Sequence, residues 1–495
     1  DSLPYTEEQL QQSAAAFEDQ AWPALAGLYG ERAEPGQQIT VLNARIPGLG
    51  GYYSADNELP RELNSYSNQR PMIFINTDSR PPGSDGYVSV LAHETQHLLH
   101  RRVLGHPAIW FNEGGSMLTE HLSGFGDDSL AGTYLIDPDV QLNDWSALSG
   151  SPNSHYGAAE LFLRYLNDQL PDGLPLGELA GRDAGDETQT LVDAIRRRHP
   201  DIQSFSDLYA TWAVANLIND PQLADGRYAY QSLPQTVEPV GALPSDETGL
   251  VRQLGADYLE WQPAATQRTI VFSGAATVPV LGAGVPPGGG GRFWWGGRGD
   301  SRISTLSAAL RVPEGGASLR FDAWHDIEQD YDYAYLTLSE DGGATWQPLA
   351  IPASEPGNPL GLNLGQGVTG QSGGWREQQA DLGRWAGKEI SLRFWLVNDE
   401  AYNTPGLALA GLRVDGAAPL DWQGAGFVEI ANRLPQEWEL RGVVFAPGQP
   451  PSVEEIPVAA GQARWTIPAG ARAVLVVSGA TAATTEPARY AYRAE

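Results

Sequence analysis

Two histidines and a glutamate stand close together in the segment Leu91-Ala-His-Glu-Thr-Gln-His-Leu-Leu-His100. Residues four apart lie on one face of a helix, so His93 and His97 can present two imidazoles to one metal ion. Glu94 is one step further round the helix, and its carboxylate can reach a water held in an open coordination position. The spacing predicts a metal site of the zinc-peptidase type, with Glu94 as the general base.

The sequence around this motif predicts a buried helix. Apolar residues recur at helical spacing from Tyr87 to Val103, and the first turns, Tyr87-Val-Ser-Val-Leu-Ala92, are strongly apolar. A short strand, Met72-Ile-Phe-Ile-Asn76, is expected upstream because it is β-branched and is bounded by turn-forming residues. We therefore expect the motif to lie inside a folded domain rather than on an exposed helix.

Two histidines leave a zinc ion short of a third protein ligand. The downstream segment Trp110-Phe-Asn-Glu-Gly-Gly-Ser-Met-Leu-Thr-Glu120 resembles the gluzincin peptidases, in which a second helix supplies a glutamate to zinc. Within that group it is most similar to the hyicolysin branch. The resemblance implies that Glu113 is the third ligand. The alternative for Glu113 is a carboxylate favoured by the dipole at the start of a helix.

The second helix is expected from Gly114 to Leu122, and Asn112 suits its N-cap. Glu120 lies two turns beyond Glu113 on the same face. Glu120 is therefore a candidate acceptor for the N–H of a ligand histidine, and a solvated helix surface is the alternative.

Three other histidines are rivals for the metal: His100, His106 and His121. His100 shares the metal-facing side of its helix, but at about 1.5 Å per residue it lies roughly 10 Å along the axis from His93. The extended metzincin motif is not met, because it needs Gly and His at positions 100 and 103. We expect each of the three rivals to be structural or exposed.

A zinc hydrolase also needs a group that stabilises the developing oxyanion. The segment from Asn153 to Tyr165 is expected to begin a helix, and similar gluzincins carry a Tyr before a Gly on such a helix. The resemblance implies this role for Tyr156, with His155 as a second candidate and a core aromatic as the alternative. Upstream, Gly50-Gly-Tyr-Tyr-Ser-Ala-Asp56 looks like an edge strand, to which an extended peptide substrate can add.

The composition excludes several other classes. The chain has 495 residues, and its 31 Lys and Arg against 61 Asp and Glu give a formal net charge of −30, which excludes nucleic-acid binding. Cysteine is absent, so any metal must be held by His and carboxylate ligands. No apolar run suits a membrane span, and the first residues do not resemble a signal sequence. The protein is expected to be secreted with its signal already removed, since Gly- and Trp-rich β-modules beside acidic surfaces favour secretion over the cytosol.

The chain divides into two regimes. The first carries helical patterns with few strands and predicts an α+β domain, and the second alternates short strands with turns, which is typical of β-sandwiches. Similar segments at 269–277 and 474–481 are compatible with one domain split by an insertion. The expected divisions are an α+β zincin-like catalytic domain at 1–235, a β-rich segment at 236–289 that belongs to such a split sandwich, a jelly-roll sandwich at 290–416 and a C-terminal sandwich at 417–495.

Motifs within about residues 290–415 resemble the jelly-roll module of immune inhibitor A-type secreted metallopeptidases. They are Trp294-Trp-Gly-Gly-Arg-Gly-Asp-Ser301, Phe321-Asp-Ala-Trp-His-Asp326, Ser339-Glu-Asp-Gly-Gly-Ala-Thr-Trp346 and Tyr402-Asn-Thr-Pro-Gly406. Modules of that kind often bind calcium, and the candidate ligands are Asp300, Asp326, Glu328, Asp330 and Asp332. The chain departs from its relatives at Leu407-Ala-Leu-Ala-Gly-Leu412, where they carry paired aspartates. The alternative for the acidic run is a solvated loop.

Together, these features predict a secreted, bacterial zinc endopeptidase of gluzincin type that acts on protein or peptide substrates. The Gly-Ala-Met-Glu-Asn sequence of related aminopeptidases is missing, and Glu58 is a poor substitute for its acidic residue. A zinc aminopeptidase is one alternative. The other is a non-catalytic protein that contacts glycans, proteins or a cell surface through its β-modules and carries a structural zinc.

Overall fold

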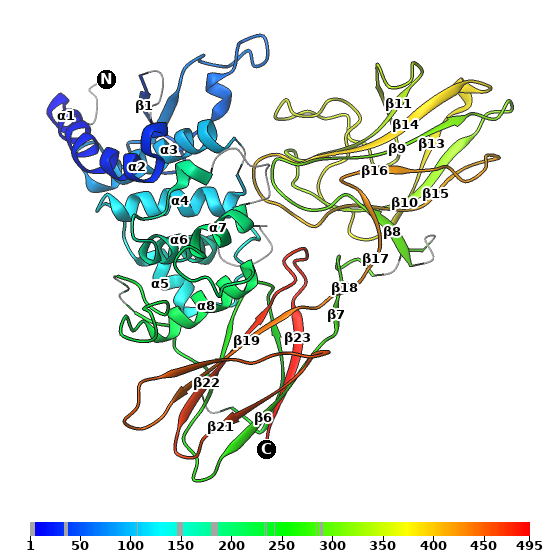
Figure 1. Cartoon of the computed structure of the whole chain (residues 1–495). Coiled ribbons are helices and arrows are strands. Elements are labelled where there is room, and N and C mark those ends of the chain that lie inside the picture. The colour runs from blue at the N-terminus through cyan, green and yellow to red at the C-terminus, as the bar shows by residue number, and fades with distance from the viewer. Residues whose placement is uncertain are drawn as a thin grey trace.

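The computed structural model describes residues 5–33, 38–105, 107–145, 152–179, 187–231, 233, 235–241, 243–284, 286–287 and 291–495. A helical region comes first, and two regions built from β-sheets follow it (Figure 1). This arrangement agrees with the multidomain α+β and all-β regimes expected from the sequence. Among these residues, no helix is long and apolar enough to cross a membrane.

The helical region contains the α-helices α1 (Glu7–Ala16), α2 (Trp22–Tyr29), α3 (Asp85–Leu104), α4 (Ile109–Leu122), α5 (Ser129–Ile136), α6 (Pro152–Gln169), α7 (Glu187–Ile195) and α8 (Phe205–Ile218). A π-helical segment, η1 (Phe17–Ala21), joins α1 to α2, and short 3₁₀ segments are η2 (Gly30–Ala33), η3 (Ala55–Glu58) and η4 (Leu176–Leu179). Helix α3 begins where Ser84 Oγ accepts the Tyr87 backbone N–H at 3.3 Å. It ends at Gly105, whose φ of 81° suits a residue without a side chain.

A small mixed sheet covers α3. Strand β3 (Met72–Asn76) lies in its centre, parallel to β1 (Thr40–Ala44) and antiparallel to the edge strand β2 (Gly51–Tyr53). Ile73 and Ile75 are fully buried and cluster with apolar residues of α3. A Cβ at Gly51 would lie 2.6 Å from the Phe74 carbonyl oxygen and 2.6 Å from Val90, so β2 needs glycine to lie this close to α3.

The C-terminal sandwich is assembled from two separate stretches of the chain. Its sheets have the orders β20-β19-β22-β5 and β21-β6-β23-β4. The strands are β4 (Asp246–Val251), β5 (Asp257–Trp261) and β6 (Arg268–Gly274), then β19 (Trp438–Phe445), β20 (Ser452–Glu455), β21 (Gln462–Ile467), β22 (Arg472–Gly479) and β23 (Ala488–Ala494). Strands β7 (Thr277–Val278) and β18 (Leu434–Pro435) pair with each other. They lie in the chain just before and just after an inserted segment.

That insertion, residues 292–431, is a second sandwich, here called the inserted module. Its sheets have the orders β13-β10-β15-β8-β17 and β12-β11-β14-β9-β16, and Phe321 of one contacts Phe394 of the other at 4.9 Å between ring centroids. The strands are β8 (Arg292–Trp295), β9 (Ile303–Arg311), β10 (Ser318–Asp326), β11 (Tyr333–Ser339), β12 (Gln347–Leu349), β13 (Arg376–Asp381), β14 (Glu389–Val397), β15 (Gly406–Val414), β16 (Gln423–Ala425) and β17 (Val428–Ala431), with a 3₁₀ turn η5 (Gly383–Trp385). The module extends past the boundary expected at residue 416, because β16 pairs with β9 and β17 with β8.

The C-terminal sandwich packs against α8. Val443, Val474 and Val476 belong to the same hydrophobic cluster as the helices of the first region. The Tyr258 hydroxyl donates to the Ala213 carbonyl of α8 at 2.8 Å. The sandwich therefore shares a continuous core with the helical region.

Two half-buried carboxylates, Asp139 and Asp257, lie at the same junction. Burial and the charge of Asp257 raise the pKa of Asp139 to about 7, and burial raises the pKa of Asp257 to about 6. Asp139 accepts the Arg252 backbone N–H at 2.7 Å, and Asp257 accepts the Tyr490 hydroxyl at 2.6 Å. The Arg252 charge opposes the rise at Asp139, whereas Asp137 adds to the rise at both carboxylates.

Asp139→Asn should make the stability of the protein less dependent on pH. The pKa of Asp139 is raised in the folded state, so ionising this carboxyl disfavours folding. The free energy of unfolding is therefore highest, as far as Asp139 is concerned, below about pH 4, and it falls as the pH rises through about 7. An Asn still accepts the Arg252 N–H but carries no charge. Calorimetry measures the difference in Tm between the variant and wild type. This difference should favour the variant more at about pH 8.5 than at about pH 5, because each unit of pKa shift corresponds to about 1.4 kcal/mol of stability. A difference that does not change with pH, as expected for the exposed control Asp172→Asn, would contradict this assignment.

Candidate metal centre

Helix α4 lies between α3 and α6, and two consecutive glycines allow it to approach both. A Cβ at Gly114 would lie 2.9 Å from the Ala159 carbonyl oxygen of α6, and a Cβ at Gly115 would lie 2.5 Å from Gln96 Nε2 of α3. Both distances are shorter than a Cβ contact tolerates. The residue that precedes this pair, Glu113, is therefore held close to the motif face of α3.

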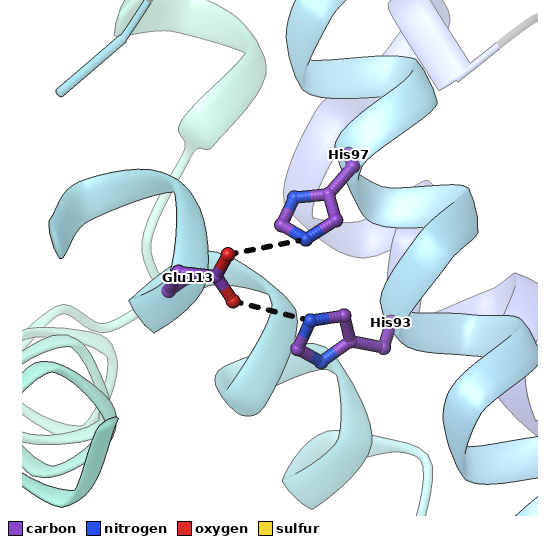
Figure 2. Close-up of side chains that lie close together, drawn as sticks. All are labelled: His93, His97 and Glu113. Carbon is purple, nitrogen blue, oxygen red and sulfur yellow. Dashed lines mark ion pairs between the residues drawn. The ribbon is translucent and has the colours of Figure 1, made fainter. Parts of the chain in front are cut away.

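His93, His97 and Glu113 converge on one point, as Figure 2 shows. Glu113 Oε2 lies 3.2 Å from His93 Nε2, and Glu113 Oε1 lies 3.6 Å from His97 Nε2. One ligand atom from each residue falls within 4.8 Å of the other two, and within the described part of the chain no other group of three such residues does so. The side chains are between 13% and 16% exposed, so the point is reachable but largely shielded from solvent.

The chemistry of these residues fits a zinc ion. Two imidazoles and a carboxylate are a common ligand set of catalytic zinc. Glu113 Oε2 is buried and has no hydrogen-bond partner in the described structure, which suits an atom that faces a cation. Burial lowers the pKa of His93, but the carboxylates of Glu113, Glu120 and Glu94 outweigh burial and raise that pKa well above its ordinary range. The centre thus carries an excess of negative charge that a cation would balance.

The outer nitrogens of the two imidazoles are occupied by residues that orient the rings. His93 Nδ1 lies 2.7 Å from Glu120 Oε1, and the second oxygen of Glu120 accepts the Ser89 hydroxyl. His97 Nδ1 lies 3.3 Å from Ser116 Oγ, which donates to Gln96 Oε1 at 2.6 Å. These contacts direct both Nε2 atoms towards Glu113, which is the arrangement that metal-binding histidines need.

Glu94 lies beside this point and is 7% exposed. Its carboxylate accepts the backbone N–H of Tyr53 in the edge strand β2. Burial raises the pKa of Glu94, and the nearby histidines only partly oppose the rise. A carboxylate with a raised pKa is better suited to take up and return a proton near neutral pH.

Tyr156 reaches the centre from α6. Its hydroxyl lies near Glu113 and helps to lower the pKa of that carboxylate. The charge of Glu113 together with burial raises the pKa of Tyr156, so the hydroxyl stays protonated. Its ring packs against Trp145 at 4.7 Å between centroids. His155 also packs against Trp145, at 6.0 Å, and is 4% exposed. The structure thus brings Tyr156 to the centre and His155 into the adjacent core.

The rival histidines lie elsewhere. His100 is fully buried near Tyr29 and Phe111, and burial lowers its pKa to about 3. His121 is also partly buried, near Arg164, and its pKa is lowered. His106 lies outside the described residues.

The expected start of the second helix was wrong. Helix α4 begins at Ile109 with Ala108 as its N-cap, so Asn112 lies within the helix and does not cap it. The Asn112 side chain lies near His100 instead and partly opposes the lowering of the His100 pKa by burial. The cap comes from outside the helical region, because the Ile109 backbone N–H donates to Asp300 Oδ2 of the inserted module at 2.8 Å.

A cluster of carboxylates lies in the inserted module behind Asp300. Asp332 is fully buried and accepts the Asn398 side-chain N–H at 2.7 Å and the Asp399 backbone N–H at 2.8 Å. Burial and the charges of Asp399, Asp332 and Asp300 raise the pKa of Glu328 to about 8. Oxygens of Glu328, Asp300 and Asn398 are buried without hydrogen-bond partners in the described structure.

Of the five candidate calcium ligands, this cluster contains Asp300, Glu328 and Asp332. The other two bind elsewhere, since Asp326 accepts the Gln371 amide at 3.1 Å and Asp330 accepts the Gln329 amide at 3.0 Å. Sequence reasoning missed Asp399 and Asn398, which follow β14 and meet Asp332 across the fold. It also missed Ser89 and Ser116, although their helical spacing from His93 and Glu120 was a usable signal.

The comparisons with known proteins concern the β-rich half of the chain. Residues 278–429 match the family described as the immune inhibitor A-like MAM domain. The pre-pro-metalloprotease PrtV of Vibrio cholerae serotype O1 (strain M66-2) is 36% identical over 133 residues, which cover 27% of this chain and 13% of that protein. Immune inhibitor A of Bacillus thuringiensis subsp. alesti is 26% identical over 167 residues, or 33% of this chain and 22% of that protein. Bacillopeptidase F of Bacillus subtilis (strain 168) is 23% identical over 135 residues, or 27% and 8%.

These similarities support a metallopeptidase-associated family for the inserted module. They cover between 8% and 22% of the length of these relatives. The motif around His93 lies outside the residues that match the family description. The activity of the whole chain therefore has to be argued from the metal centre itself.

Replacing the third ligand should release the metal. Glu113→Ala leaves two imidazoles, and we expect the affinity for zinc to fall by more than about 100-fold, because losing even an outer contact costs 10- to 100-fold. His121→Ala is the matched control and should bind one zinc ion as wild type does. Competition with a fluorescent zinc chelator measures both affinities. Wild-type zinc affinity in Glu113→Ala would contradict the assignment of this ligand.

Proposed function

We propose that the chain is a secreted, bacterial zinc endopeptidase of gluzincin type, with a zincin-like catalytic domain in its helical region. The observation that carries the proposal is the convergence of His93, His97 and Glu113 beside the buried carboxylate of Glu94. The names of the relatives, which include a metalloprotease, support the same class of activity. The Gly- and Trp-rich β-modules beside acidic surfaces support secretion.

The residues of the centre suit peptide hydrolysis. Zinc held by His93, His97 and Glu113 would act as a Lewis acid and would lower the pKa of a water molecule. Glu94 would accept a proton from the attacking water and return it to the leaving amine, a role that its raised pKa suits. Tyr156 keeps its proton and donates a hydrogen bond to the oxyanion that develops on the substrate carbonyl.

The edge strand β2 provides a place for a peptide backbone. β2 pairs with β3 on one side and lies at the margin of its sheet, directly above Glu94. A substrate in extended conformation can add to this free edge and gain backbone hydrogen bonds without regard to its side chains. The scissile bond then lies over the metal centre.

The surroundings of the centre favour an endopeptidase over an aminopeptidase. An aminopeptidase needs an acidic residue that is available for the free amino group of its substrate. Glu58 is the nearest candidate in the sequence, but it accepts the Tyr53 hydroxyl at 2.8 Å and pairs with Arg102. Its carboxylate is therefore already engaged.

Peptides blocked at the amino terminus should be cleaved as well as their unblocked counterparts.

The general base can be tested separately from the metal. Glu94→Gln should bind zinc with wild-type stoichiometry and keep its fold, because Glu94 is not one of the converging ligands. Its kcat/KM on a peptide with blocked ends should fall by about 10²- to 10⁴-fold, since proton transfer is lost. The exposed Glu8→Gln should behave as wild type. Full activity of zinc-loaded Glu94→Gln would sink this mechanism.

We also propose that the carboxylate cluster of the inserted module binds calcium. Calcium takes six to eight oxygen ligands and accepts carboxylates, amide and backbone oxygens, and water. Asp332, Glu328, Asp300 and Asp399 would contribute carboxylates in part through water, because among the described residues no three of them bring their oxygens within 4.8 Å of one another. Asn398 Oδ1 is an unpartnered oxygen in a side chain that is 6% exposed. The charges of Asp399, Asp332 and Asp300 all raise the pKa of Glu328, and a bound calcium ion would offset this repulsion.

Calcium should stabilise the protein in proportion to the logarithm of its concentration. A concentration of 100 times the Kd adds about 2.7 kcal/mol, and roughly 2–4 °C in Tm follow from each kcal/mol in a domain of this size. Asp332→Asn should abolish the rise in Tm, whereas Asp330→Asn should retain it, because Asp330 lies outside the cluster. Melting curves from chelated protein to millimolar calcium measure the effect. An unchanged Tm in wild type would favour a solvated loop.

A further inference from the structure

The cleft beside the metal centre has walls from two parts of the chain. A cavity of about 160 Å³ is lined by His97 and Glu113 on one side and by Tyr53 of the edge strand β2 on another. Glu400 and Ala401 of the inserted module close it from a third side. These last two residues belong to the loop 398–405, which connects β14 to β15. A loop of the inserted module thus borders the same cavity as His97 and Glu113.

The loop is held firmly in this position. The Asp399 carboxylate accepts the Ala401 backbone N–H at 3.0 Å, and its own backbone N–H donates to Asp332 at 2.8 Å. At the other end, the Asn403 side chain donates to Asp300 Oδ2 at 3.1 Å. Asp300 Oδ2 is also the acceptor for the first backbone N–H of α4. The loop and the helix that carries Glu113 therefore share one anchor.

The loop also approaches the catalytic side chains. Tyr402, which is 42% exposed, contributes to the raised pKa of Tyr156. It lies next to Ala401, which lines the cavity. The inserted module therefore lines the cavity through Glu400 and Ala401, and Tyr402 lies near enough to Tyr156 to affect its pKa.

Charge in the cavity is asymmetric. The Arg101 guanidinium, on the wall formed by α3, donates to the Gly105 carbonyl at 3.1 Å. Glu400 is exposed, and among the described residues it takes part in no ion pair or side-chain hydrogen bond. A cationic side chain that faces the wall formed by the inserted module would give Glu400 a partner, whereas the Arg101 guanidinium favours an anionic group only on the wall formed by α3. The net charge of −30 attracts cationic peptides in the same sense.

We propose that residues 399–403 of the inserted module form a wall of the substrate cleft, and that Glu400 selects substrates with a Lys or Arg side chain at the position this wall faces. The inference rests on the proposed peptidase function and specifies its substrate class. The inserted module is then a part of the substrate-binding site and not a separate appendage. Ala401 keeps the cavity open, since it is the smallest side chain that lines it from the module.

The test is a library of peptides with both ends blocked, in which each position is varied among Arg, Gln and Glu. Zinc-loaded wild type should cleave peptides with Arg at one position about fivefold better than those with Gln, the range expected for one exposed ion pair. Glu400→Gln should abolish this preference, and Glu400→Lys should reverse it in favour of Glu. Ala401→Trp should raise the KM for every peptide while zinc content stays unchanged.

Two controls separate the possible failures. Glu389→Gln removes an exposed carboxylate of the same module away from the cavity, and it should keep the wild-type preference. Arg101→Gln should strengthen the preference for Arg, because it removes the opposing charge. If wild type cleaves the library but Glu400→Gln has the same Arg-to-Gln ratio, the role of the module is wrong and the peptidase function stands. If wild type cleaves none of the peptides, both proposals fall.

Discussion

The metal centre depends on the close contact between α3 and α4. Two imidazoles on one helix are fixed by their spacing, but the third ligand must arrive from another helix to within a few tenths of an ångström. Gly115 allows that approach because no side chain separates α4 from Gln96. Ser116 and Glu120 then tie α4 to the imidazoles of α3. A larger residue at Gly115 would move Glu113 away from the two imidazoles, and the three side chains would no longer converge although none of them had been replaced.

The inserted module helps to position α4 in this contact. Asp300 caps the first turn of α4, so the position of the helix that carries Glu113 is set partly by a residue 191 positions away. The same residue borders the carboxylate cluster and anchors the loop 398–405. Occupation of the cluster by a cation, the cap of α4 and the wall of the cleft are thus linked through one side chain.

The sequence predicted what depends on short-range spacing. The face shared by His93 and His97 follows from helical geometry, and the alternation of strands and turns indicated sandwiches. The start of α4 was mispredicted because its cap, Asp300, is distant in sequence, which made Asn112 look like the best local candidate. The module boundary was placed too early because β16 and β17 are short strands whose partners lie more than 100 residues upstream. Contacts of this kind require the fold, and no local pattern encodes them.

One zinc ion at this centre is proposed to make the chain a peptidase. The most direct test measures bound metal and casein cleavage on the same sample before chelation, after chelation and after zinc is returned. We expect one zinc ion per chain, cleavage that disappears with the metal, and full recovery when one equivalent of zinc is added. A chain that binds one zinc ion but never cleaves casein or peptides, or cleavage that survives removal of the metal, would contradict this proposal.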